Sequence, residues 1–206
     1  MKLYLSSYHL GNNPEKLVEL FSGNKKIAII ANAMDFADDS QREEKIKHSI
    51  TELKNLGMLP EEIDLRVYFG EQEELSKKLN NYGAVYVRGG NTFILRRAMA
   101  QSGFDKWIKN KNKNKNFVYA GYSAGICVLS PTLHGIELVD NPDSVPEKYN
   151  PKIIWEGLNI IDSILVPHYQ SDHPESKMVE KEVQYYIKNK IPFKTLHDGE
   201  VIIKNN

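Results

Sequence analysis

Residues 117–129 read Phe117-Val-Tyr-Ala-Gly-Tyr-Ser-Ala-Gly-Ile-Cys-Val-Leu129, in which two apolar runs are joined by Gly-Tyr-Ser-Ala-Gly. The first run predicts a buried strand at 117–120, and the second run predicts the start of a helix. Glycines on both sides of the serine permit the strained backbone angles of a tight strand-to-helix turn. The pattern therefore predicts that Ser123 lies at the tip of this turn and projects its hydroxyl into a cleft.

Outward from this turn, short apolar runs alternate with longer amphipathic segments, as expected when parallel strands alternate with covering helices. The order predicts an α/β fold, a three-layer flavodoxin-like sandwich around a mostly parallel sheet, in one domain over 1–206. The expected strands are 2–6, 26–31, 62–68, 84–87, 117–120, 163–166 and 200–203. The expected helices are 39–56, 71–80, 91–99 and a later one with Met178, Val179, Val183, Tyr186 and Ile187 on its apolar face.

Composition excludes several classes of function. Lys plus Arg and Asp plus Glu each number 27, so the formal net charge is zero and nucleic acid is not an expected partner. Cys127 is the only cysteine, which excludes an internal disulfide and a multi-thiolate zinc site. With no signal peptide or membrane span in the pattern, we expect a cytoplasmic protein with no membrane partner and no metal or cofactor.

The serine turn also has the features of an acyl-transfer site. A serine at a helix N-terminus lies beside free backbone N–H groups, so the amide of Ala124 is the natural donor to a developing oxyanion. A second strand-to-helix turn, Arg88-Gly-Gly-Asn-Thr-Phe93, has paired glycines that allow close backbone approach, and the amide of Gly90 is the expected second donor. Taken alone, each turn could simply be a capped helix start.

A serine nucleophile needs a nearby base. Of the six histidines, His168 follows an apolar strand directly, at the strand end where open α/β sheets bind ligands. His173 and His134 are rivals for this role. The third member, which orients the imidazole, must be an acid or amide, and spacing leaves Glu137, Asp140 and Asp198 open.

These motifs together resemble peptidase E and its relatives, the serine peptidase family S51, which includes aspartyl dipeptidases and cyanophycinases. The resemblance rests on Gly-Gly-Asn-Thr-Phe, then Gly-Tyr-Ser-Ala-Gly with Pro131-Thr132 after it, then Pro-His-Tyr. It implies a fold similar to class I glutamine amidotransferases, with Ser123 in place of their cysteine. It also implies His168 as the base and the amides of Gly90 and Ala124 as the oxyanion hole.

The same resemblance suggests the remaining site residues. It places the acid in the loop after Pro-Thr, which favours Glu137, with Asp198 and Asp140 as alternatives. Asn91 matches a substrate-contacting asparagine. His134 stands where the pattern has an arginine that meets an aspartyl side chain, and an imidazole cannot give the bidentate grip of a guanidinium. We therefore expect substrate preference to depart from strict aspartyl specificity.

The function predicted from the sequence is a serine peptidase that hydrolyses short peptides. It would be a dipeptidase related to aspartyl (Asp-X) dipeptidase, acting as a monomer or homodimer on a small peptide substrate. The alternatives are an α/β serine esterase or amidase for another acyl substrate, a non-catalytic binding protein on the same fold, and a thiol enzyme using Cys127. The loop 137–159 is expected to wall the cleft and restrict it to short substrates.

Overall fold

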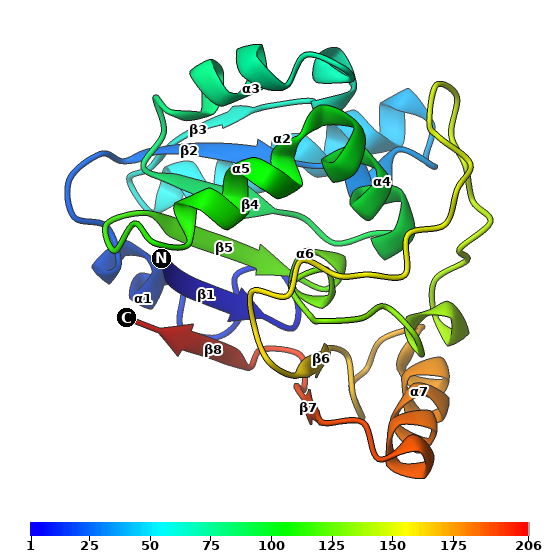
Figure 1. Cartoon of the computed structure of the whole chain (residues 1–206). Helices are drawn as coiled ribbons and strands as arrows, with labels where there is room; N and C mark the ends of the chain where they lie inside the picture. The colour runs from blue at the N-terminus through cyan, green and yellow to red at the C-terminus, as the bar shows by residue number, and fades with distance from the viewer. Residues whose placement is uncertain (206) are drawn as a thin grey trace.

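The computed structural model describes residues 1–205, and its centre is a six-stranded sheet in the order β3-β2-β4-β5-β1-β8 (Figure 1). Neighbouring strands run parallel except β8, which pairs antiparallel with β1 at one edge. A second, two-stranded parallel sheet pairs β6 with β7. The strands are β1 (Lys2–Ser6), β2 (Lys26–Ile30), β3 (Leu59–Glu62), β4 (Ala84–Val87), β5 (Val118–Tyr122), β6 (Ile164–Val166), β7 (Phe193–Thr195) and β8 (Val201–Lys204).

Helices cover both faces of the central sheet, so the predicted three-layer α/β fold is confirmed. Strand side chains alternate between the faces: Val85 and Val87 pack with α3, α4 and α5, whereas Tyr86 packs with α1 and α2. The helices are α1 (Glu15–Glu19), α2 (Asp39–Asn55), α3 (Gln72–Leu79), α4 (Thr92–Ser102), α5 (Phe104–Lys111), α6 (Ala124–Cys127) and α7 (Ser176–Asn189). Single 3₁₀ turns lie at Asn32–Met34, Leu65–Tyr68 and Ile136–Leu138.

The strand expected at 62–68 is wrong. The third strand is Leu59–Glu62, and the chain then enters a 3₁₀ turn at Leu65–Tyr68. Two side-chain bonds, one local and one remote in sequence, impose this turn: Asp64 Oδ1 accepts the N–H of Arg66 at 2.9 Å, and Asn32 Oδ1 accepts the N–H of Leu65 at 3.1 Å. These two bonds to polar side chains have therefore outweighed the strand propensity of the β-branched and aromatic residues at 62–68.

The apolar face expected for the last helix is correct only in part. Val179, Val183 and Tyr186, spaced by four and three residues, are buried against β6. Met178 and Ile187, which sequence analysis assigned to the same face, are 45% and 56% exposed. The helix therefore buries a narrow stripe rather than the broad face expected.

The long loop after Leu138 is held by the α4 helix rather than lining the cavity described below. The buried guanidinium of Arg97 donates to the carbonyl oxygens of Pro142 at 2.7 Å and Pro151 at 3.2 Å. Because one cation satisfies carbonyls from two points of the loop, it fixes a segment that has no regular structure of its own. The expectation that this loop walls the cleft is therefore wrong for the cavity that contains Ser123.

The contact between α6 and β4 requires glycine at position 125. A Cβ there would lie 2.2 Å from the carbonyl oxygen of Val87, a main-chain atom that cannot rotate away. We expect Gly125→Ala to lower the free energy of unfolding by about 3 kcal/mol, measured by urea denaturation, because the close-packed interior cannot absorb this overlap.

Gly70→Ala is the matched control for this substitution. Gly70 has a φ of +85°, but no heavy atom lies within 4 Å of the position of an added Cβ. Only backbone strain of about 1 kcal/mol is then expected. A larger loss of stability for Gly70→Ala than for Gly125→Ala would contradict the packing argument.

Within residues 1–205, no helix is both long enough and apolar enough to cross a membrane.

Candidate active site

Ser123 occupies a strained turn between β5 and α6. Its φ of 50° and ψ of −122° lie in a region that L-residues rarely adopt. The end of β4 approaches this turn closely, and a Cβ on Gly89 would lie 2.8 Å from the Cβ of Ser123. Only glycine at 89 therefore permits this approach, and the partly exposed serine projects from a rigid junction of two central strands.

Two backbone amides near Ser123 have no acceptor. Within residues 1–205, no oxygen lies in hydrogen-bonding position for the N–H of Gly90 or of Ala124. Gly90 has a φ of +138°, and a Cβ there would meet the carbonyl oxygen of Ala33 at 2.4 Å, so the position again requires glycine. Free amides at the ends of β4 and β5 are the donors that an oxyanion hole needs.

His168 is buried directly after β6, and its backbone has a φ of 60°. Its Nδ1 lies 2.7 Å from Asp198 Oδ1. The hydroxyl of Ser7 accepts the backbone N–H of His168 at 2.9 Å and donates to Asp198 Oδ1 at 2.8 Å. The backbone N–H of Asp198 in turn donates to Ser171 Oγ at 2.8 Å. A carboxylate can only accept, so the proton lies on Nδ1 and leaves Nε2 as a free base.

The other two carboxylates proposed as the third member lie elsewhere. Glu137 accepts the N–H of Gly135 at 2.5 Å within its own turn. Asp140 accepts the N–H of Thr92 at 2.8 Å, at the start of α4, where burial raises the pKa of its carboxyl to about 7. The structure thus brings Asp198 to His168 and holds Glu137, the residue favoured by sequence analysis, in a local turn.

The two residues expected to bind substrate do not line the serine cavity. Asn91 caps α4, because its Oδ1 accepts the amides of Phe93 at 2.9 Å and Ile94 at 3.0 Å. His134 is exposed and stacks on Trp155 with ring centroids 4.4 Å apart and an interplanar angle of 7°. Both side chains are therefore committed to contacts that support the loop and helix.

Ser123 and His168 face one cavity of about 150 Å³ at the carboxyl ends of the strands. Its wall carries charges of both signs, and the rings of Tyr8 and His173 lie beside His168. The lining residues are Tyr8, His9, Met34, Lys45, Arg88, Gly89, Gly90, Tyr122, Ser123, His168, His173 and Glu175.

The charged wall of this cavity was not predicted from the sequence. Arg88 is almost fully buried, and its Nη2 donates to the hydroxyl of Tyr122 at 2.7 Å, whereas its Nε and Nη1 have no partner among the described residues. His173, considered only as a rival base, stacks on His168 with centroids 3.8 Å apart and planes 9° apart. Its spacing of five residues from His168, within Pro-His-Tyr-Gln-Ser-Asp-His, was the available signal.

Burial lowers the pKa of His168, and the neighbouring His173 adds to this effect, while Asp198 opposes it. A neutral imidazole is the form that can accept a proton. If His168 is the base, kcat/KM should fall as pH decreases through a midpoint below the ordinary histidine value of 6.5 and be level above it. A pH profile of kcat/KM from about 4.5 to about 8 measures this midpoint directly, because that range brackets the reference pKa of histidine.

His173→Asn provides a check on the assignment of that midpoint. Removing the stacked imidazole takes away one repulsive charge and exposes His168 to water, and both changes raise the pKa of His168. The midpoint should therefore move upward in this variant. A wild-type midpoint above 6.5, or a downward shift, would contradict His168 as the titrating base.

Cys127 is not placed to act as a nucleophile. The thiol is buried, donates to the carbonyl oxygen of Leu165 at 3.6 Å, and has its pKa raised by burial. A raised pKa leaves little thiolate near neutral pH. These contacts disfavour the thiol-enzyme alternative.

Comparison with known proteins gives a consistent result over the whole chain. A peptidase family S51 profile matches residues 5–206. An uncharacterized peptidase of Listeria monocytogenes is 31% identical over 134 residues, or 65% of this chain and 62% of its own length. An uncharacterized peptidase of Pasteurella multocida is 25% identical over 190 residues, or 90% of this chain and 86% of its own length.

Solved structures show the same fold. The crystal structure of a candidate peptidase E from Listeria monocytogenes has a TM-score of 0.74 and 26% identity, covering 98% of this chain and 97% of that one. A peptidase from an acI-B1 actinobacterium shares the fold alone, with a TM-score of 0.65 and 18% identity over 98% of this chain and 82% of its own. The chain therefore belongs to peptidase family S51.

Proposed function

We propose that the chain is a serine peptidase that hydrolyses short peptides through an acyl-enzyme at Ser123. The observation that carries this proposal is that a strained serine, the free amide of Gly90 and a buried imidazole bonded to a carboxylate meet at one cavity, with the free amide of Ala124 directly after the serine in the chain. Strained backbone clusters at functional sites, so the conformation of Ser123 supports a functional role for this turn. We further propose that the chain acts in the cytoplasm, where a free thiol such as that of Cys127 stays reduced.

In the first half of the proposed reaction, His168 Nε2 takes the proton of Ser123 Oγ as that oxygen attacks the peptide carbonyl carbon. The carbonyl π electrons move onto oxygen, which accepts the N–H groups of Gly90 and Ala124. Asp198 keeps the ring in the required tautomer and stabilises the imidazolium. The C–N bond then breaks, and the leaving amine takes the proton from Nε2.

In the second half, water enters from the open side of the cavity. His168 Nε2 removes one of its protons while the water oxygen attacks the acyl carbon. The second tetrahedral intermediate rests on the same two amides. Its collapse breaks the bond to Ser123 Oγ, which regains the proton from His168, and the carboxylic acid product leaves.

The charges of the cavity favour a short, zwitterionic substrate. Lys45 and Arg88 provide cations and Glu175 an anion on the wall beside Ser123. A dipeptide carries an ammonium group and a carboxylate within a few ångströms of its one peptide bond, so both signs have partners there. Because His134 lies outside this wall, we propose a dipeptidase related to aspartyl dipeptidase but with its own selection of the first residue.

The test is hydrolysis of a dipeptide panel, Asp-Leu, Asn-Leu, Glu-Leu and Ala-Leu, together with intact-mass analysis after treatment with a fluorophosphonate. We expect cleavage of at least one dipeptide and the addition of one phosphonyl group that is absent in Ser123→Ala. Cleavage of Asp-Leu alone would indicate aspartyl specificity, and a different pattern would indicate redirected specificity. Labelling without peptide cleavage would favour an esterase or amidase, and no labelling would favour a binding protein.

A further inference from the structure

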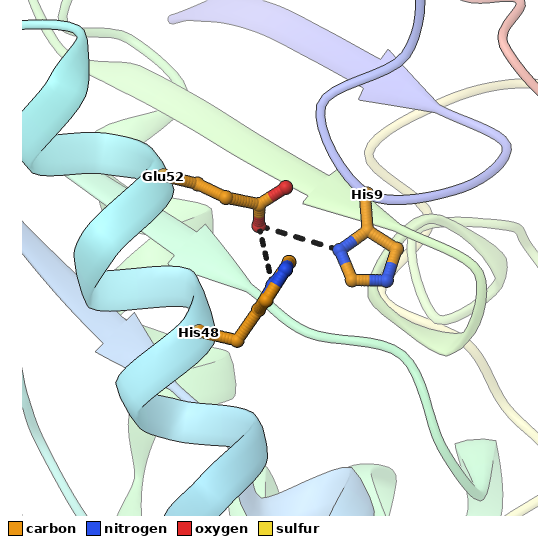
Figure 2. A group of neighbouring side chains, drawn as sticks. All are labelled: His9, His48 and Glu52. Atoms are coloured by element: carbon orange, nitrogen blue, oxygen red, sulfur yellow. Dashed lines mark hydrogen bonds and ion pairs between the residues drawn. The ribbon is translucent and has the colours of Figure 1, made fainter.

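A second cluster of polar side chains lies beside the serine cavity, at the join between the β1–α1 loop and α2. Figure 2 shows His48 and Glu52 one turn apart on α2, with His9 facing them from the loop. Glu52 Oε2 lies 3.3 Å from His9 Nδ1 and 3.3 Å from His48 Nδ1. The potential ligand atoms of all three residues lie within 4.8 Å of one another.

We propose that His9, His48 and Glu52 form a binding site for a divalent transition-metal ion of the zinc class. Two imidazoles and one carboxylate are a donor set that suits zinc and is too rich in nitrogen for magnesium or calcium. In a tetrahedral site with bonds of about 2.0–2.1 Å, neighbouring ligand atoms are separated by about 3.3–3.4 Å. Both contacts of Glu52 have this length, which is long for hydrogen bonds between these groups.

Ring orientation separates this cluster from the other histidine cluster of the described chain. The rings of His9 and His48 lie at 77° to one another with centroids 5.1 Å apart, so their in-plane lone pairs can converge on one point. His168 and His173, grouped with Glu175, are stacked with planes only 9° apart. An ion cannot lie in both of two parallel planes, and His168 Nδ1 is already bonded to Asp198.

The surroundings support the proposed ligands and leave room for a further one. The ring of His9 stacks on Tyr122 with centroids 5.2 Å apart and planes 13° apart, which fixes its orientation. His9 and Glu52 are about three-quarters buried and His48 is more than half exposed, at the edge of an open hollow of about 510 Å³. Water can therefore reach the fourth coordination position.

One neighbour limits the expected affinity. The guanidinium of Arg88 lies with its Cζ 5.8 Å from the centroid of the Tyr122 ring, on which His9 also stacks. The same cation repels a divalent ion. We therefore expect affinity in the micromolar range rather than that of a structural zinc finger.

The proposed ion would tie the β1–α1 loop to α2 at a point adjoining the catalytic residues. Ser7, two residues before His9, bonds both the backbone N–H of His168 and the carboxylate of Asp198. The ring of Tyr8 packs edge-on against His168 with centroids 5.8 Å apart. Binding at His9 therefore restrains the segment that supports His168.

The experiment is titration of Zn²⁺ into the tag-free chain by calorimetry, with Co²⁺ as an absorption probe of tetrahedral geometry. We expect one Zn²⁺ per chain, at micromolar affinity, and intense Co²⁺ bands in the visible range. His48→Gln and Glu52→Gln should each weaken Zn²⁺ binding at least tenfold and abolish those bands. This readout is independent of peptidase activity, so failure of the proposed function leaves the metal test intact.

Two matched controls assign the binding to this cluster. His197→Gln removes an exposed histidine outside both clusters, and His173→Gln removes one from the other cluster, so both should bind Zn²⁺ as the wild type does. Should His48→Gln prove unfolded by circular dichroism, His9→Gln gives the same comparison. Absence of Zn²⁺ binding, unchanged binding in the His48 and Glu52 variants, or loss only in His173→Gln would overturn the proposal.

Discussion

Ser123→Ala and His168→Ala should each lower kcat for a cleaved dipeptide by about 10⁴- to 10⁶-fold, because nucleophile and base act as one unit. The double variant should be no slower than either single variant. Initial rates measured at saturating peptide, with enzyme concentrations high enough to detect the residual rate, give this comparison. The remaining activity would come from the amides of Gly90 and Ala124 and from binding alone.

Ser130→Ala is the matched serine control. Ser130 is fully buried, lies outside the serine cavity, and its hydroxyl has no partner among the described residues. Removing this hydroxyl should leave kcat within about twofold of wild type, because Ser130 does not line the cavity and its hydroxyl bonds no residue of the proposed triad. A loss of kcat in the double variant equal to the product of the two single losses would contradict a coupled pair. A loss of similar size in Ser130→Ala would contradict it as well.

Asp198→Asn should lower kcat by about 10³- to 10⁴-fold, whereas Glu137→Gln should change it by less than about threefold. An amide can donate to His168 Nδ1 and so stabilise the wrong tautomer, in which Nε2 carries the proton and cannot act as a base. Glu137→Gln alters only a bond to the amide of Gly135. Single-turnover rates at saturating peptide separate this effect on chemistry from any effect on binding.

Folding must be checked in both acid variants, since Ser7 also bonds Asp198. Near-ultraviolet circular dichroism and the midpoint of urea unfolding serve this purpose. Asp140→Asn is a further control, because Asp140 bonds the start of α4 rather than His168. A large loss of kcat in Glu137→Gln with normal activity in Asp198→Asn would restore the assignment that sequence analysis favoured.

The features that sequence analysis predicted well are those set by neighbouring residues. The first strand at 2–6 and the fourth at 84–87 match the structure residue for residue, because each has an apolar centre, Leu3-Tyr4-Leu5 and Ala84–Val87, and is followed by a turn. The glycine spacing around Ser123 likewise specifies a tight turn without tertiary information. The strand expected at 62–68 failed because Asn32, which is 33 residues before Leu65, supplies a turn-forming acceptor to the N–H of Leu65.

The third member of the proposed triad required tertiary information. Asp198 follows His168 by thirty residues, and its position depends on β7 pairing with β6 and on β8 pairing with β1. No local spacing encodes these two pairings. Asn91 shows the converse, since a capping residue and a substrate ligand have the same appearance in the sequence and only the bonds to α4 distinguish them.

The edge position of β8 has a consequence for the lifetime of the assembled site. This strand is paired on one side only, through β1, at the edge of the central sheet (Figure 1). Strands paired on one side open more readily than central ones, and amide hydrogen exchange measures such opening. An opening of β8 would release one anchor of the turn that carries Asp198 but leave Ser123 on β5, so local fraying alone would separate the proposed acid from the serine without global unfolding.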